Sequence, residues 1–307
     1  MMDVFQEGEP RIEQTRVRSP FRDAVRRFSK NWAAMLSTAV IVILILAAIF
    51  ARFLHTTDPN AINFSALYQG PSVSHWFGTD PEGRDLYSRI LFGMRIPLIV
   101  SFVGTFITVV LGVGLGLIAG FYGGVVDSLV SRFTDFMFAF PAFLLTIIIV
   151  SLFGASFDAA FPNGVGRTII LTAVFALVSW PPLMRFVRSL GLSLKEQQFV
   201  EAARTSGTSG WNIIRRHLAP NVWGLVLVQA ALTVAYIIGA EAVLSILGLG
   251  VNDPTPDLGA MLYDGTNYWD LNPWGMYFPA IFLTVLIVAF TFIGDGVRDA
   301  VDPRSSN

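Results

Sequence analysis

Six long apolar runs constrain this chain more than any other feature of its sequence. A helix of roughly 20 apolar residues spans a bilayer whose hydrocarbon core is about 30 Å thick. Charged residues make up 14% of the 307 residues, whereas soluble domains usually contain about 25%. We therefore predict an all-α polytopic membrane protein with about six transmembrane helices. The runs cover approximately residues 32–53, 96–120, 133–153, 168–186, 222–244 and 276–293.

The first run follows a basic arm, an order that is also typical of signal peptides. Residues 1–31 contain seven arginines and lysines. The apolar run that follows is longer than the roughly 7–15 residues of a signal-peptide core. We therefore interpret residues 1–31 as a cytoplasmic arm and residues 32–54 as a retained first transmembrane helix. An external loop region is expected over residues 55–95.

The distribution of Lys and Arg predicts how the spans are oriented, because cytoplasmic loops carry an excess of these residues. Sixteen of them fall in the arm, in the connections after the second and fourth runs, and in the tail, whereas four fall in the other connections. We expect a multi-pass inner-membrane protein with both termini in the cytoplasm. The core transmembrane domain is predicted over residues 96–294 and a cytoplasmic tail over residues 295–307.

Glycines and prolines occupy positions in the runs that affect helix packing. Gly112, Gly116 and Gly120 repeat every four residues, so they share one helix face on which another helix can pack closely. Pro141 lies inside the third run, and the pair 181–182 lies inside the fourth. Proline kinks a helix because it lacks a backbone donor. Such bends either line a pathway or serve packing alone.

Two acidic residues lie at membrane depth, where charge is costly and often marks a functional site. Asp135 comes three residues after Arg132, so we expect the two side chains to pair on one helix face. Glu241 is expected to cap or pair with polar groups of an external loop, or else to line the pathway. No second acidic residue in the runs has the spacing of a metal site or a proton relay.

Several classes of function lack the residues that they need. The chain contains no cysteine, which excludes disulfides, thiolate catalysis and cysteine-ligated metals. Asp80, Glu82 and Asp85 miss the spacing of a calcium loop, and no phosphate loop or nucleophile elbow is present. We therefore expect no catalytic residue, no metal, no cofactor bound by this chain and no nucleic acid. The substrate-binding residues stay unidentified.

A polar and basic stretch over residues 195–220 separates the fourth and fifth runs. Its Ala, Glu, Gln and Arg residues favour helix, and two glycines divide it into helices over about residues 195–206 and 210–218. The second helix is amphipathic, and Pro220 is expected to end it and to start the next span. On physical grounds alone, the stretch either floats on lipid headgroups or docks with a cytoplasmic partner.

The same stretch resembles the EAA loop of ATP-binding-cassette (ABC) importer permeases. That pattern is Glu-Ala-Ala, a Gly six residues after the Glu, and a Pro thirteen residues after the Gly, a spacing that this sequence reproduces. The ending "HLAPN" is typical of the C-type permease subunits of dipeptide and oligopeptide importers. The matching residues are Glu201, Ala202, Ala203, Gly207 and Pro220.

Other segments are similar to that branch over nearly the whole chain. The sequence departs from its usual pattern at Pro97, Ile246 and Leu258, all of which we place on the external side. The similar segments are "HWFGTDPEGRDLYSRILFGMR" (75–95), "EAVLSILGLGVNDPTPDLGAML" (241–262) and "IGDGVRDAVDPR" (293–304).

The resemblance implies the type I ABC importer permease fold and ATP-driven import. Glu201 would be a polar anchor for an ATPase, Ala202 and Ala203 close-packing positions, and Gly207 the turn between two helices. The implied partners are a homologous second permease subunit, two cytoplasmic ATP-binding subunits, an extracytoplasmic solute-binding protein and the lipid bilayer. The partner subunits would bind ATP. The implied solutes are di- or oligopeptides, with nickel chelates or oligosaccharides as alternatives.

Two other classes of function remain open at this point. A self-contained secondary transporter or channel would carry intramembrane ionisable residues or inverted repeats, and the sequence shows few of the former and no evident repeat. An intramembrane enzyme would need a nucleophile and a base, and no candidate pair is present.

Overall fold

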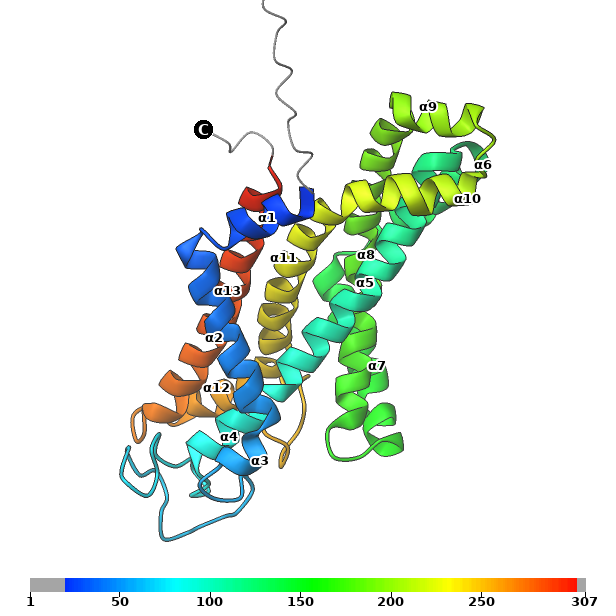
Figure 1. Ribbon diagram of the computed structural model, residues 1–307. Coiled ribbons are helices and arrows are strands. Elements are labelled where there is room, and N and C mark those ends of the chain that lie inside the picture. The colour runs from blue at the N-terminus through cyan, green and yellow to red at the C-terminus, as the bar shows by residue number, and fades with distance from the viewer. Residues whose placement is uncertain (1–19, 303–307) are drawn as a thin grey trace, which may run out of the picture.

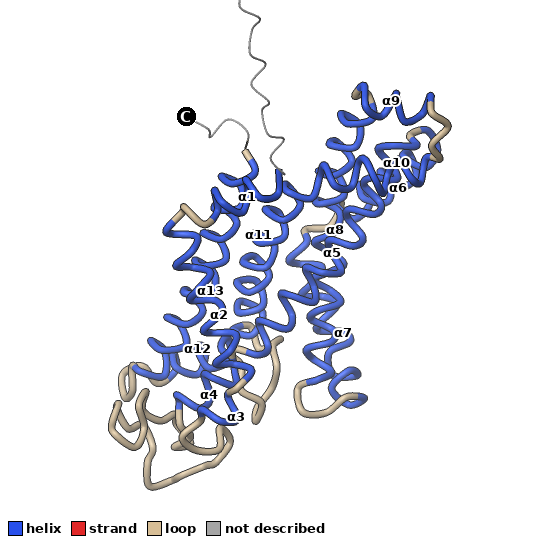
Figure 2. The backbone as a smooth tube through the Cα atoms, in the orientation of Figure 1, coloured by secondary structure: helices blue, strands red, loops and turns tan. Residues whose placement is uncertain are grey.

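A computed structural model describes residues 20–302 of the chain (Figure 1). Residues 1–19 of the predicted arm and 303–307 of the predicted tail lie outside that range. Every regular element between residues 20 and 302 is a helix (Figure 2), which confirms the all-α prediction. The longer helices are α2 (Trp32–Ile49), α5 (Arg95–Tyr122), α7 (Ala142–Ala160), α8 (Val165–Lys195), α11 (Ala219–Ile246) and α13 (Trp274–Val301). The shorter ones are α1 (Pro20–Phe28), α3 (Ala51–Leu54), α4 (Leu86–Gly93), α6 (Gly124–Phe138), α9 (Gln198–Thr205), α10 (Gly210–Ile213), the π-helix η1 (Ile214–Leu218) and α12 (Leu258–Asn267).

Six helical stretches are long and apolar enough to cross a membrane, which confirms the predicted number of spans. They contain α2, α5, α7, α8, α11 and α13. The first span is interrupted at Phe50, which separates α2 from α3. The last span continues as helix to Val301, beyond the core boundary predicted at residue 294.

The third span is the one whose predicted position is wrong. The prediction places Pro141 inside a helix over residues 133–153, whereas α6 ends at Phe138 and α7 begins at Ala142. Proline has no N–H and disfavours the helical conformation in the residue before it, so the chain breaks there. Because the residues on both sides of Pro141 are apolar, hydropathy alone hides this break. The prolines at 181–182, in contrast, lie inside α8 as predicted.

The predicted glycine face of α5 lies directly against α8. A Cβ atom added to Gly112 would lie 2.9 Å from Cγ of Leu183. A Cβ on Gly116 would lie 2.8 Å from the backbone oxygen of Met184, and one on Gly120 would meet the next turn of α8 equally closely. Contacts this short leave no room for a side chain, so the two helices approach each other as closely as their backbones allow.

Two ion pairs attach α6 to α8. Arg188 Nη2 donates to Asp127 Oδ2 at 2.6 Å, and Arg185 pairs with Asp135. The hydrogen bond from Arg188 lowers the pKa of Asp127, because it stabilises the ionised carboxylate. Asp135 therefore uses a partner on another helix, and the predicted local pair with Arg132 is wrong. Sequence spacing identified a possible neighbour but not the arginine that the fold brings closer.

The two ends of the helical bundle carry different structures (Figure 1). One end carries α1, α9 and α10, and we call it the α9 end. The other end carries α3, α4, α12 and the long loop before α4, and we call it the α12 end. The described parts of the chain begin and finish at the α9 end.

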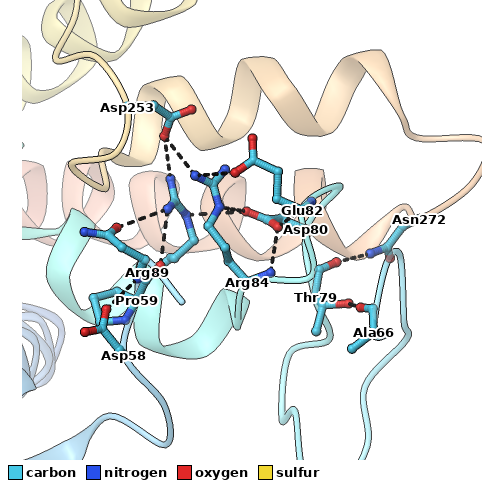
Figure 3. A network of polar contacts seen from close by, with 11 residues as sticks. Asp58, Pro59, Ala66, Thr79, Asp80, Glu82, Arg84, Arg89, Asp253 and Asn272 are labelled. Carbon is cyan, nitrogen blue, oxygen red and sulfur yellow. Dashed lines mark hydrogen bonds and ion pairs between the residues drawn. The ribbon is translucent and has the colours of Figure 1, made fainter. Parts of the chain in front are cut away.

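A network of charged side chains joins two loops at the α12 end (Figure 3). Arg84 Nε donates to Asp80 Oδ2 at 2.5 Å, and Arg89 Nη2 donates to Asp253 Oδ1 at 3.0 Å. Glu82 also pairs with Arg84. The network therefore ties the loop before α4 to the loop before α12. In the part of the chain that the structure describes, no three His, Asp or Glu side chains are grouped to hold a metal ion.

Candidate functional site

The short helix α9 is the element of the polar stretch that stands apart from the spans. It lies across the α9 end, beyond the end of α8 and beside α10 (Figure 1). Val200 on its inner face is fully buried. It packs in a cluster with Val187 of α8, Ile213 of α10 and Leu218 of η1. This apolar contact fixes α9 to the end of the helical bundle.

The outer face of α9 is polar and exposed in the described part of the chain. Glu201 and Ala202 are exposed, and Ala203 is partly exposed beside the buried cluster. In the described residues the Glu201 carboxylate forms no ion pair, although it lies in the first turn of α9, where the helix dipole favours an anion. The small Ala202 beside it lets another surface approach closely. This face therefore offers one acidic group and a flat backbone to a partner.

Gly207 ends α9 in a turn that few other residues adopt. Its φ angle is +75°, in the left-handed region that glycine enters without steric cost. The N–H of Gly207 donates to Arg204 O at 3.0 Å, and the N–H of Thr208 donates to Ala203 O at 3.0 Å. This is the hydrogen-bond pattern of a Schellman motif. The turn gives α9 a defined end and directs the chain back toward α10.

The helix after the turn packs tightly on the end of α5. A Cβ atom added to Gly210 would lie 2.9 Å from Cε1 of Phe121. The guanidinium of Arg204 lies over the same aromatic ring, with Cζ 5.1 Å from the ring centroid. Phe121 thus contacts both short helices of the stretch, and it connects α9 and α10 to the α5–α8 pair.

Pro220 does not end the second short helix, so that prediction is wrong. The chain runs from α10 through η1 into α11 as one continuous helical stretch, Gly210–Ile246, and Pro220 lies in the first turn of α11. A proline at such a position removes a donor that the preceding turn would use. The π-helical turn before it changes the hydrogen-bond register, and Asn221 Nδ2 donates to His217 O. Together these features let the helix pass through the proline.

The predicted site residues are therefore distributed over three places. Glu201, Ala202 and Ala203 share α9, Gly207 forms the turn, and Pro220 lies beyond η1 at the start of α11. The three predicted glycines of α5 form the α8 contact and lie outside this surface.

Sequence reasoning missed the contact of Arg204 with Phe121 and the π-helical turn. Neither feature has a sequence signal of its own. The apolar cluster that holds α9 also contains residues of α5, α8 and α11, so α9 packs on a junction of three spans.

Two protein families match this sequence. The family described as "Binding-protein-dependent transport system inner membrane component" matches residues 112–307. The family described as "N-terminal TM domain of oligopeptide transport permease C" matches residues 19–71. The first match contains the whole stretch that carries α9 to α11.

Curated relatives align with nearly the full chain. The dipeptide transport system permease protein DppC of Alkalihalophilus pseudofirmus is 40% identical over 96% of this chain and 93% of its own length. The oligopeptide transport system permease protein OppC of Haemophilus influenzae is 38% identical over 98% and 95%. The glutathione transport system permease protein GsiD of Pectobacterium atrosepticum is 37% identical over 96% and 95%.

A solved structure shares the fold. A chain of the MetNI methionine ABC transporter in an inward-facing conformation superposes with a TM-score of 0.53 at 22% identity. The superposition covers 70% of this chain and 96% of that chain. At this identity, the likeness concerns the fold alone.

Proposed function

Because this chain belongs to the family of binding-protein-dependent transport system inner membrane components, we propose that it is a permease subunit that imports small peptides. The relatives named above carry a dipeptide, an oligopeptide and glutathione in their names, and glutathione is itself a tripeptide. Their identity with this chain extends over nearly its full length, which supports a peptide as the solute class. None of the three relatives named above carries a nickel chelate or an oligosaccharide in its name.

We infer that α9 couples the permease to a cytoplasmic ATPase subunit. The observation that carries this proposal is the division of α9 into a buried face and a bare outer face. Val200 is 0% exposed, whereas Glu201 and Ala202 are exposed, and the Glu201 carboxylate forms no ion pair among the described residues. A helix whose inner face packs on the bundle and whose outer face is exposed is suited to fit a cleft on another protein.

The packing below α9 suggests how a push on this helix would reach the membrane. Closure of an ATPase dimer around ATP would move α9 as a rigid body. Through Val200 the movement would reach α8 and η1, and through Phe121 it would reach α5. Since α5 and α8 touch along their backbones, they would move together as one unit. ATP would be bound and hydrolysed by the partner subunits.

The proposed assembly follows from this role. The chain would pair with a homologous second permease, two ATP-binding subunits and an extracytoplasmic solute-binding protein. The α9 end and both termini would face the cytoplasm, and the α12 end would face the solute-binding protein. The charge distribution supports this orientation, since most Lys and Arg residues in the connections belong to the α9 end.

The solute class is tested by transport in proteoliposomes that contain the complete complex. Uptake of labelled dipeptide, glutathione, nickel chelate and oligosaccharide is compared. Each solute is supplied at a saturating concentration, with ATP inside or outside the vesicle. We expect ATP-dependent uptake of a peptide. Uptake of the chelate or the oligosaccharide in preference to every peptide would contradict the proposal.

The coupling role is tested by reversing one charge on α9. Loss of a buried charge contact costs about 2–5 kcal/mol, so Glu201→Lys should reduce uptake and uptake-linked ATP hydrolysis at least tenfold. Glu196→Lys is the matched control. Glu196 is also acidic and exposed, but it is the C-cap residue of α8 and does not belong to α9. Equal uptake by the two variants at equal membrane levels would exclude the docking role of Glu201.

A further inference from the structure

Two fully buried carboxyl groups meet where the end of α11 contacts the start of α12. Glu241 lies near the C-terminal end of α11, and Asp257 is the N-cap of α12. Both residues are 0% exposed, and their carboxyl groups are close enough to interact electrostatically. Of the two roles expected for Glu241, the structure thus shows contact with a loop group. A buried pair of acids needs a compensating partner.

Each carboxyl group has one oxygen in an ordinary hydrogen bond and one oxygen without any donor. Ser245 Oγ donates to Glu241 Oε1 at 3.0 Å, and the N–H of Ala260 donates to Asp257 Oδ2 at 3.0 Å. Glu241 Oε2 and Asp257 Oδ1 are buried and have no hydrogen-bond partner. Leaving such atoms without a partner costs more than an ordinary hydrogen bond contributes. The geometry therefore lacks one donor between the two acids.

No cationic side chain supplies this donor. In residues 20–302, the arginines on the neighbouring elements donate to other groups, and none pairs with Glu241 or Asp257. Two adjacent carboxylates in a buried site cannot both stay ionised without a cation. The other charged residues at the α12 end include Asp80, Arg84, Arg89, Arg95, Asp158, Arg167, Asp253 and Asp264.

We propose that Glu241 and Asp257 form a proton-binding site, in which one proton bridges Glu241 Oε2 and Asp257 Oδ1. The proton turns one acid into a donor and leaves the other as its acceptor, so both unpartnered oxygens are satisfied at once. It also halves the negative charge that the site has to bury.

The hydrogen bonds around the pair indicate which acid carries the proton. Asp257 accepts an N–H from the first turn of α12, and helix N-terminal N–H groups favour an ionised carboxylate. Glu241 receives only the hydroxyl of Ser245. The proton therefore stays on Glu241, and the protonated Glu241 carboxyl group donates a hydrogen bond to the Asp257 carboxylate. Burial raises the pKa of Asp257, because the charged form loses its hydration, and this strengthens the hold of the pair on its proton.

The proton-binding site fastens α12 to α11. A Cβ atom added to Gly259 would lie 2.6 Å from Cβ of Ser245 and 2.9 Å from Cα of Ala242. At Gly259 the backbone of α12 therefore lies directly against the backbone of α11 at Ala242. Loss of the proton would leave two carboxylates in contact, and their repulsion would push α12 away from α11. The α12 end would then loosen as the pH rises, a property that does not depend on the transported solute.

Infrared spectroscopy of the purified full chain in lipid nanodiscs tests for the proton directly. At neutral pH, a protonated carboxyl group shows a C=O stretch that ionised carboxylates lack. We expect this band in the native chain, its loss in Glu241→Gln, and its retention in Glu201→Gln, which removes an exposed acid of the same type. A native chain without the band at neutral pH would overturn the proposal, as would a band unchanged in Glu241→Gln.

The pH dependence of thermal unfolding provides a second readout. The folded pair holds a proton that the unfolded chain releases more easily, so its contribution to stability is lost as pH rises through the folded pKa. Between about pH 4, where a carboxyl group of the unfolded chain ionises, and the pH at which the folded pair releases its proton, the unfolding equilibrium constant of the native chain should rise about tenfold per pH unit for one proton. At higher pH this rise should stop, because both states have then lost the proton. In Glu241→Gln the new amide donates to Asp257 without titrating, so this dependence should vanish. Asp257→Asn, which keeps an N-capping side chain, should lose it too. Equal pH dependence in the native chain and in whichever variants fold would overturn the site.

Discussion

Replacement of Gly116 by alanine tests the contact on which the α5–α8 unit depends. The new Cβ would lie 2.8 Å from the backbone oxygen of Met184 and 2.9 Å from Cβ of Val187. The optimal van der Waals separation of such atoms is about 3.5–4.0 Å, so the two helices must separate by roughly 0.5–1 Å. Neither atom is the flexible end of a side chain that could turn aside. Overpacking of this kind costs about 1–3 kcal/mol.

Gly114 offers a matched control on the same helix. A Cβ atom added there meets no other atom within 4 Å, and alanine is a better helix former than glycine by up to about 1 kcal/mol. Each kcal/mol shifts the thermal midpoint of a protein of this size by about 2–4 °C. In purified protein we therefore expect a midpoint several degrees lower for Gly116→Ala and an unchanged or higher midpoint for Gly114→Ala. Equal midpoints in the two variants would refute the packing argument.

Three further predictions concern other parts of the molecule. Asp127→Asn should weaken the attachment of α6 to α8. The folded pKa of Asp127 is low, so the ion pair loses its contribution to stability as pH falls through that pKa, and the variant should lack this loss. Thermal midpoints over an acidic pH series check this, and an unchanged series would argue against the ion pair. Gly207→Ala should fray the end of α9, since the left-handed conformation costs an L residue about 1–2 kcal/mol, and limited proteolysis should cut the following loop faster; an unchanged rate would contradict it. Single cysteines at Ser74 and Ser209, which are both exposed, should be labelled from opposite sides of the membrane, and labelling from one side would overturn the six-span topology.

Hydropathy predicted the overall fold because a membrane span must be apolar along its whole length. The family match and the shared fold confirm the predicted ABC importer permease fold, and they favour it over a self-contained transporter or channel. The same hydropathy misplaced the third span at Pro141. An apolar run does not show where one helix stops and the next starts, whereas the backbone chemistry of proline does.

Partners that lie far apart in the sequence could not be predicted. Asp135 forms an ion pair with Arg185, and the Glu241 carboxyl group interacts with that of Asp257. Both interactions depend on how separate segments come together. An N-cap signal at Asp257, an acidic residue directly before a helix-forming segment, was available in the sequence. It indicates the start of α12 but not the buried acid that meets it. Tertiary contacts of this kind follow from the fold rather than from local spacing.

The outer face of α9 was recognised by resemblance rather than by physics. Composition and charge predicted a polar helical stretch and left open whether it floats on lipid or docks with a partner. The structure adds that Val200 is buried and that Glu201 and Ala202 face outward. A helix that only floated on headgroups would present its apolar face to lipid, whereas the apolar face of α9 is used to hold it to the bundle.

ATP-driven import by this chain requires that α9 contacts an ATPase subunit, and site-specific cross-linking detects that contact. The chain contains no cysteine, so Ala202→Cys introduces a single thiol on the outer face of α9, and Ser74→Cys introduces one at the α12 end. Each variant is assembled with its partners in membranes, modified with a thiol-reactive photo-cross-linker and irradiated. We expect a cross-link to the ATPase subunit from position 202 and none from position 74. Absence of that product at position 202 in an assembled, transport-active complex would contradict the coupling role of α9.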